Sequence, residues 1–328
     1  MRFRYAYLLL AGAIIAAAGC GPSVIQVGLE VPTSTAQRPA APPTAAPSSE
    51  ASPATPVPPT ASPAPTVAPA GIDAATQALI DYLRAINGRD WAQAYRMWAG
   101  DGAASGQTLE QFTQGFARTV QVDARIGTPA SAEGSVTLPM ALVAIADADN
   151  PAKDQVVQHY QGTYTLQSAG GGWRIASARM EATPGDGNPP QDMRDPATLL
   201  SAYVDAINRR EFGRAYTYWN HLGQNSGQSF SQFRQGFADT AQVAIQLGQA
   251  QLQGAAGSSY ADVPALIVAR QAGGSTQTYC GTYTLRRLNV PPFDQFGWHI
   301  EQAALAPVAA VQLGSEQAAR MLQNGCQP

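Results

Sequence analysis

The chain carries one pattern of apolar, glycine and aromatic positions twice. Residues 79–127 return without a gap as residues 200–248, and nearly half of the aligned positions are identical. The identities are of the kinds that fill cores and turns: Tyr82/Tyr203, Ile86/Ile207, Asn87/Asn208, Tyr95/Tyr216, Trp98/Trp219, Phe112/Phe233, Gly115/Gly236, Phe116/Phe237 and Thr119/Thr240. Because these positions keep the same spacing in both copies, we predict one folding unit made twice.

The first part of each copy has the period of amphipathic helices. In the first copy, Leu79, Tyr82, Leu83 and Ile86 follow at i, i+3, i+4 and i+7, which places them on one helix face. We predict helices over 73–87, 90–98 and 109–119, the last two with Asp90 and Thr108 as N-caps. The second copy predicts helices over 197–208, 211–219 and 231–240.

The period then changes from helix to strand. Val120, Val122, Ala124 and Ile126 alternate with polar neighbours, as in a half-buried strand. Further strand-like runs cover 135–146, 155–167 and 173–181, with glycine or Asp-Asn-Pro turns between them. Three helices followed by about four antiparallel strands predict an α+β domain in which the helices pack on one face of a curved sheet.

These residues resemble a known family. The run Tyr-x-x-Ala-Ile-Asn, then Ala-Tyr-x-x-Trp and Phe-x-x-Gly-Phe-x-x-Thr before the strands, is similar to the NTF2-like (cystatin-like) superfamily, and closest to extracytoplasmic domains of bacterial lipoproteins. The resemblance implies two tandem α+β cones. The superfamily holds isomerases, dehydratases, cyclases and non-catalytic modules, so the fold does not choose a function.

The N-terminus has the pattern of a secretory signal. Arg2 and Arg4 precede an apolar run that ends in small residues before Cys20. This ending resembles the bacterial lipoprotein signal, which implies a lipid on Cys20 and a membrane-anchored, extracytoplasmic protein. The alternative is an ordinary signal peptide or an uncleaved anchor.

Composition divides the rest of the chain. The segment after Cys20 is rich in Pro, Ala, Thr and Ser, a composition that cannot bury enough apolar surface to fold. The predicted divisions are a signal peptide at 1–19, a lipidated cysteine and disordered tether at 20–71, a first NTF2-like domain at 72–182, a linker at 183–196, a second domain at 197–306, and a tail with a short helix at 307–328.

Two cysteines remain in the second domain and its tail. With Cys20 committed to a lipid in an exported protein, Cys280 and Cys326 form the natural disulfide pair. The alternative is two free thiols.

The sequence shows no recognisable catalytic set. An isomerase-like site needs a carboxylate base or an Asp-His pair inside the cone, but His159, His221 and His299 align with non-histidine residues of the other copy. No metal-binding, phosphate-binding or nucleophile motif occurs, and we expect no metal and no cofactor.

Most of the repeated aromatic residues are expected in the core. The candidates for lining a pocket are aromatic residues that carry a polar group, either a tyrosine hydroxyl or a tryptophan N–H: Tyr95, Trp98, Tyr164, Tyr216, Trp219 and Tyr283.

The content and distribution of charged residues limit the kinds of partner that the protein is expected to bind. Charged residues make up 13% of the chain, the formal net charge is −3, and no basic stripe is present, which argues against nucleic acid. We expect a non-catalytic, lipid-anchored module of the cell envelope that binds a small apolar ligand or an envelope protein. The alternatives are a SnoaL- or ketosteroid-isomerase-like enzyme retained in one domain, and a structural spacer in an envelope assembly. The sequence does not indicate the oligomeric state.

Overall fold

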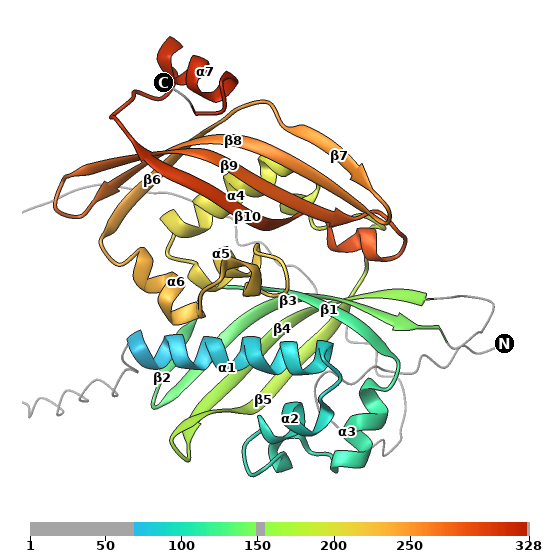
Figure 1. The fold of residues 1–328 in the computed structure, drawn as a ribbon. Coiled ribbons are helices and arrows are strands. Elements are labelled where there is room, and N and C mark those ends of the chain that lie inside the picture. The colour runs from blue at the N-terminus through green and yellow to red at the C-terminus, as the bar shows by residue number, and fades with distance from the viewer. Residues whose placement is uncertain (1–68, 149–154, 327–328) are drawn as a thin grey trace, which may run out of the picture. The chain divides into compact units, whose positions relative to one another are not determined.

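The structure is a computed structural model that describes residues 69–148 and 155–326 (Figure 1). The signal peptide, the lipid attachment at Cys20 and nearly all of the predicted tether lie outside these residues, and remain predictions. The described residues of both repeats fall into one compact unit. No helix among the described residues is long and apolar enough to cross a membrane.

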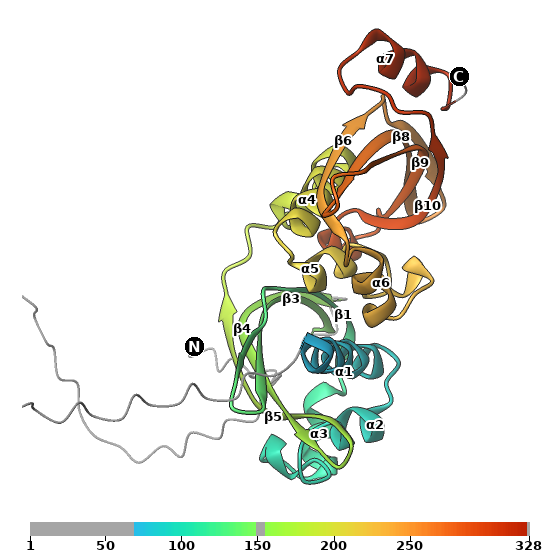
Figure 2. The same cartoon turned by 90° about the vertical axis from the view of Figure 1, so that its left-hand side faces the viewer.

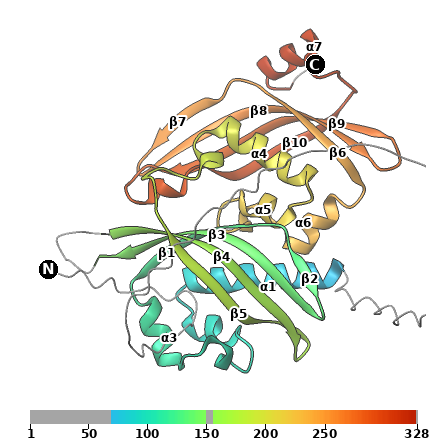
Figure 3. The same cartoon turned by 180° about the vertical axis from the view of Figure 1, so that it is seen from behind.

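The first repeat places three helices against one antiparallel sheet. The helices are α1 (Pro69–Asn87), α2 (Trp91–Arg96) and α3 (Leu109–Phe116). The strands are β1 (Thr119–Ile126), β2 (Ala130–Ala132), β3 (Ser135–Asp147), β4 (Gln155–Ala169) and β5 (Gly172–Thr183). The sheet order is β1-β3-β4-β5, and β2 pairs with β3. Figure 3 shows α1 lying along the sheet of its own repeat.

The second repeat follows the same plan and adds a tail. The helices are α4 (Pro196–Asn208), α5 (Phe212–Thr217), α6 (Phe230–Gly236) and the tail helix α7 (Glu316–Gln323). The strands are β6 (Thr240–Leu247), β7 (Gln251–Ala255), β8 (Ser258–Gln271), β9 (Thr276–Leu288) and β10 (His299–Val308), in the order β10-β9-β8-β6 with β7 paired to β8. Figure 2 shows how strongly each sheet curls.

The predicted fold class is confirmed, with one addition to each sheet. Both repeats are α+β, with helices on the concave face of an antiparallel sheet. Each sheet has five strands instead of four, because short edge strands (β2 and β7) fold back onto the strand that follows them. The strand β2 is only three residues long and mostly exposed, so it carries no alternation that the sequence could reveal.

Side-chain caps set where the helices begin. The Asp90 carboxylate accepts a hydrogen bond from the Gln93 amide at 2.9 Å, and Thr108 forms a reciprocal capping box with Gln111. Ser229 forms the same box with Gln232, so α6 begins at Phe230, one residue before the predicted start. The third helices end at Phe116 and Gly236, earlier than predicted, because the chain passes directly into β1 and β6.

A repeated asparagine fastens the first helix of each repeat to its sheet. The Asn208 side chain donates to the Val243 carbonyl at 2.9 Å and accepts from the Val243 amide at 2.7 Å. Asn87 makes the same two bonds to Val122, at the same distances. The sequence predicted a helix terminator here, and the structure shows a clamp between a helix end and a strand.

Replacing Asn208 by alanine is expected to destabilise the protein by about 2 kcal/mol, because both backbone groups of the buried Val243 lose their side-chain partner. The shift in urea midpoint measures the effect. Asn289→Ala is the control, since exposed Asn289 makes a single long bond to Ser259, and it should change stability by less than about 0.5 kcal/mol. Equal midpoints for the two variants would contradict the clamp.

The tail packs on the convex side of the second sheet. Helix α7 lies on the side of the sheet away from α4 (Figures 1 and 2), and a small apolar cluster joins Leu266 and Cys280 to Ala318, Met321 and Leu322. The predicted disulfide is confirmed: Cys280 and Cys326 are bonded, with their Cα atoms 5.5 Å apart. Cys280 points away from the helices, as its alignment with Gln161 indicated, and the tail buries it.

The connection between β9 and β10 is longer than the connection between β4 and β5, and it packs against the first repeat. Its single turn of 3₁₀ helix, η4 (Phe293–Phe296), places Phe296 in a cluster with Val143 and Ile145 on the outer face of β3. All three of these side chains are buried. The additional hairpin residues therefore cover apolar positions on the first sheet.

Polar contacts also join the two repeats. The guanidinium of Arg234 in α6 pairs with Asp73 in α1 at 3.0 Å, and the Phe230 amide donates to the Gln77 side chain at 2.8 Å. His299 lies 3.2 Å from the carboxylate of Asp123, and both side chains are buried. The repeats thus meet through helices, the hairpin and one buried Asp-His pair, and not by pairing strand to strand.

Candidate functional site

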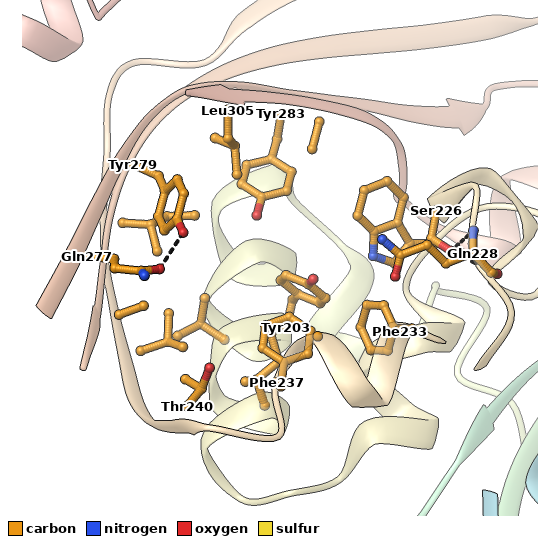
Figure 4. Close-up of a pocket in the computed structure, with 18 of the residues that line it drawn as sticks. Tyr203, Ser226, Gln228, Phe233, Phe237, Thr240, Gln277, Tyr279, Tyr283 and Leu305 are labelled. Carbon is orange, nitrogen blue, oxygen red and sulfur yellow. Dashed lines mark hydrogen bonds between the residues drawn. The ribbon is translucent and has the colours of Figure 1, made fainter. Parts of the chain in front are cut away.

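The second repeat encloses a cavity of about 470 Å³ between its helices and the concave face of its sheet. Helices α4 and α6 supply one wall, and strands β6, β8, β9 and β10 supply the other (Figure 4). The volume lies within the roughly 300–1,000 Å³ that is typical of small-molecule sites. The cavity is therefore large enough for a ligand.

Two tyrosines pack against each other in the wall of the cavity. Tyr203 comes from α4 and Tyr283 from β9, with ring centroids 6.3 Å apart and nearly perpendicular planes (Figure 4). Trp219 and Phe233 complete the aromatic wall, with centroids 6.4 and 6.5 Å from Tyr203. These edge-to-face arrangements are stabilising and hold the rings in fixed orientations.

The position of Trp219 follows from the loop after α5. The Asn220 amide donates to the Ile300 carbonyl and the Ile300 amide donates to the Tyr218 carbonyl, both at 2.8 Å, so this loop is bridged to β10. The bridge fixes the Trp219 ring in the cavity wall, where its indole Nε1 is buried beside the hydroxyl of Tyr203, the group with which it interacts. The indole N–H and the Tyr203 hydroxyl thus partner each other inside the aromatic wall.

Neutral polar side chains lie on two opposite sides of the cavity (Figure 4). Gln271 and Gln277 stand near the ends of β8 and β9, and Tyr279 donates to the Gln277 side chain at 2.6 Å (Figure 4). Thr240, Ser226 and Gln228 add a hydroxyl, a second hydroxyl and an amide. The cavity therefore combines an apolar body with several uncharged hydrogen-bonding groups.

No charged side chain lines the cavity. Its lining residues include no carboxylate, histidine, lysine, arginine or cysteine. Burial raises the pKa of the Tyr203 phenol, and burial together with the neighbouring Tyr203 raises the pKa of Tyr283 well above its usual value. Both tyrosines are neutral hydrogen-bonding groups at physiological pH. The wall can orient an uncharged molecule, and its groups are poorly suited to general acid–base chemistry.

Some of the pocket residues suggested by the sequence line the cavity in the structure, and others hold loops in place. Trp219 and Tyr283 line the cavity. Tyr216 lies outside its lining: the Tyr216 hydroxyl donates to the Gln228 carbonyl at 2.6 Å, and the ring covers Gly223 so closely that a Cβ there would lie 2.2 Å from it. Tyr95 does the same in the first repeat, with a 2.8 Å bond to the Gln107 carbonyl. Both tyrosines fasten a loop.

Trp98 and Tyr164 occupy the equivalent centre of the first repeat. Their ring centroids are 6.4 Å apart, and both contact Tyr82 of α1. All three side chains are almost completely buried. The Tyr82 hydroxyl interacts with Trp98 and Tyr164, and burial raises the pKa of Tyr82 and of Tyr164.

Several residues of the site were not singled out by sequence. Tyr203 was placed with the core aromatics, and Gln271, Gln277 and Tyr279 were not considered. The comparison of repeats contained one signal: Gln271 of the second repeat stands opposite Thr240, where β3 of the first repeat has Ala146 opposite Thr119. Gln271 is polar where the first repeat has an alanine, and this difference at the end of a strand indicates that the edge of the cavity is polar.

The histidines lie away from this cavity. His299 is buried against Asp123, His221 lies on the loop after α5, and burial lowers the pKa of His159. Among the described residues, no group of three or more His, Cys, Asp or Glu side chains is placed to hold a metal ion.

Comparisons with known proteins concern the fold. No protein-family model matches the sequence, and no curated protein is significantly similar to it. Among solved structures, the chain is similar to a hexachlorocyclohexane dehydrochlorinase (LinA), with 11% identity, a TM-score of 0.26, and coverage of 36% of this chain and 89% of the other.

Two further structures span both repeats. A cystatin-like protein from Ruminococcus gnavus shows 11% identity and a TM-score of 0.24, covering 78% of this chain and 97% of the other. An NTF2-like protein involved in plasmid conjugation shows 9% identity and a TM-score of 0.23, covering 72% and 96%. By the architecture of its own two halves, each with three helices on a curled antiparallel sheet, this chain consists of two tandem α+β domains.

Proposed function

We propose that the protein is a non-catalytic binding protein of the cell envelope, which holds an uncharged small molecule in the cavity of its second domain. The observation that carries this proposal is a cavity of about 470 Å³ whose lining residues are aromatic, aliphatic or neutral and polar, with no charged side chain among them. The anchoring part of the proposal rests on the N-terminal sequence, with Cys20 as the lipid attachment site.

The lining defines the class of ligand. Aromatic and aliphatic side chains from α4, α6 and the sheet favour a molecule with a flat or apolar body. The hydroxyl and amide groups of Thr240, Gln271 and Gln277 favour a neutral polar group, such as a carbonyl or ether oxygen, at one position on that body. A carboxylate or an ammonium group would be buried without a counter-charge, so ionic ligands are disfavoured.

The same groups favour binding over turnover. The two central phenols are kept neutral by burial, and the wall offers no partner that could accept a proton near pH 7. Binding of an uncharged ligand should therefore be nearly independent of pH from about pH 5 to about pH 8, since no lining side chain has an ordinary pKa in that interval.

Partly filling the cavity should weaken binding. Ala303 lines the cavity on β10, directly opposite Tyr283 on β9. Replacing it by leucine places three more carbon atoms in the ligand space, and we expect affinity for a neutral apolar dye such as Nile red to fall at least about tenfold, or roughly 1.4 kcal/mol.

The matched control is Ala178→Leu. Ala178 stands opposite Tyr164 in the first repeat, as Ala303 stands opposite Tyr283 in the second. Fluorescence titration should give an unchanged affinity for this variant. Loss of dye binding in Ala178→Leu with retention in Ala303→Leu would place the site in the first domain and contradict the proposal.

A further inference from the structure

The lining of the second-domain cavity is repeated almost residue for residue in the first domain. When the helices and the paired strands of the two repeats are aligned, the lining positions carry the same residue except at four. Three of these exchanges replace one apolar side chain by another, and the fourth, Gln271, changes the lining from apolar to polar. The second repeat has Val204, Ile267, Gln271 and Leu305 where the first has Leu83, Leu142, Ala146 and Met180.

We propose that Gln271 is the specificity-determining residue of this cavity, and that it selects neutral ligands with a carbonyl group on an apolar body. The inference rests on the proposed function, because it concerns the same cavity. It adds the group on the protein that distinguishes one neutral ligand from another.

The strand places the Gln271 side chain on the cavity side of the sheet. Ile267, Ala269 and Gln271 occupy alternate positions of β8, and all three line the cavity. The Gln271 amide donates to the Ser275 carbonyl at 2.8 Å, and the Gln271 carbonyl accepts from the Gly274 amide at 3.0 Å. The backbone groups of Gln271 are therefore paired, and its side chain is the part that faces the cavity.

A second polar side chain stands directly opposite Gln271. Thr240 of β6 is its partner in the strand register, and Thr240 also lines the cavity. Within residues 69–148 and 155–326, neither the Gln271 side-chain amide nor the Thr240 hydroxyl has a hydrogen-bond partner. In the first repeat the corresponding pair is Ala146 and Thr119, which lacks the amide. The second cavity therefore has two adjacent neutral groups that are free to bond to a ligand.

The other polar pair at the strand ends does not distinguish the repeats. The Tyr279 hydroxyl donates to the Gln277 side chain at 2.6 Å, and Tyr160 donates to Gln158 at 3.2 Å in the first repeat. Because both repeats form this internal pair, the difference between the two linings rests on Gln271.

A carbonyl oxygen matches the two free groups. It has two lone pairs, so it accepts one hydrogen bond from the Gln271 side-chain nitrogen and one from the Thr240 hydroxyl. A ligand without such an oxygen leaves both groups unpaired when it displaces water from them, which costs free energy. A site that hydrogen-bonds a polar group of its ligand therefore discriminates against the analogue that lacks this group.

Fluorescence titration of the full chain with two related dyes tests the proposal. Prodan carries a propionyl ketone on a dimethylaminonaphthalene ring, and dimethylaminonaphthalene is the same fluorophore without the ketone. Gln271→Ala introduces the residue of the first repeat, and Gln271→Leu keeps a side chain of similar size without hydrogen-bonding groups. We expect both variants to bind prodan about tenfold more weakly than wild type, with a change of less than about threefold for dimethylaminonaphthalene.

Val204→Leu is the matched control. It also introduces the residue of the first repeat, at a lining position where both residues are apolar. Because leucine takes up cavity volume without changing polarity, this variant should weaken the binding of both dyes by a similar factor. Circular dichroism confirms that each variant is folded.

The ways in which the experiment can fail are distinguishable. If the wild-type protein binds neither dye, the ligand cavity itself is contradicted, and this inference with it. If wild type binds both dyes and the two Gln271 variants bind prodan as tightly as wild type, or lose both dyes equally, the selectivity of Gln271 is overturned and the cavity stands.

Discussion

Replacing Gly281 by alanine is expected to destabilise the second domain by about 3 kcal/mol or more. A Cβ on Gly281 would lie 1.9 Å from the carbonyl oxygen of Ala304 on the neighbouring strand. That atom belongs to the backbone, so no side-chain rotation relieves the overlap and β9 would have to separate from β10. Gly162 makes the same approach to the Arg179 carbonyl in the first repeat, also at 1.9 Å.

Urea denaturation of the purified variants measures this effect. Gly254→Ala is the control, because a Cβ at this exposed position of β7 meets no atom within 4 Å, and its effect should stay below about 0.5 kcal/mol. A Gly281→Ala protein that unfolds at the wild-type urea concentration would show that the strands do not approach so closely.

Removing the disulfide is expected to have the second large effect. Cys280 and Cys326 close a loop with a sequence separation of 46 residues, and the chain-entropy model gives about 4 kcal/mol for a loop of this length. The double variant Cys280→Ala/Cys326→Ala should also release α7, because the apolar cluster beneath it is small.

The comparison is between oxidised wild type, reduced wild type and the double variant. The two proteins without the bond should unfold at similar urea concentrations, both below that of oxidised wild type, and limited proteolysis should remove the tail from them first. If all three share one midpoint and one cleavage pattern, the disulfide does not stabilise the tail on the sheet.

The sequence predicted the architecture well because the repeat supplied two independent copies of each signal. Helix starts at Asp90, Thr108 and Ser315 followed from side chains that cap their own backbone, which is local chemistry. The disulfide followed from the number of cysteines and the expected compartment. Helix starts depend on residues that are neighbours in sequence, and the disulfide pair depends on how many cysteines the chain contains.

The remaining features depend on contacts between distant residues. Tyr95 and Tyr216 were assigned to a pocket because they are aromatic, repeated and polar at one end. The structure uses them to fasten loops, through carbonyl groups twelve residues along the chain. Asn87 and Asn208 likewise bond to strands 35 residues away. Identity between repeats shows that a position matters and does not show which group it contacts.

The cavity itself could not be foreseen from pattern alone. Tyr203 and Tyr283 look like core residues in sequence, and they are almost fully buried. Their role in a cavity wall depends on the curvature of the sheet, which the alternation of apolar residues does not measure.

The central claim is that the second domain holds an uncharged ligand, and native mass spectrometry of the protein purified from its original host tests it most directly. We predict a reproducible additional mass, belonging to a neutral small molecule, that is present in wild type and Ala178→Leu and absent from Ala303→Leu. A wild-type protein with no additional mass, or a molecule retained by Ala303→Leu, would contradict the account and direct attention to protein partners instead.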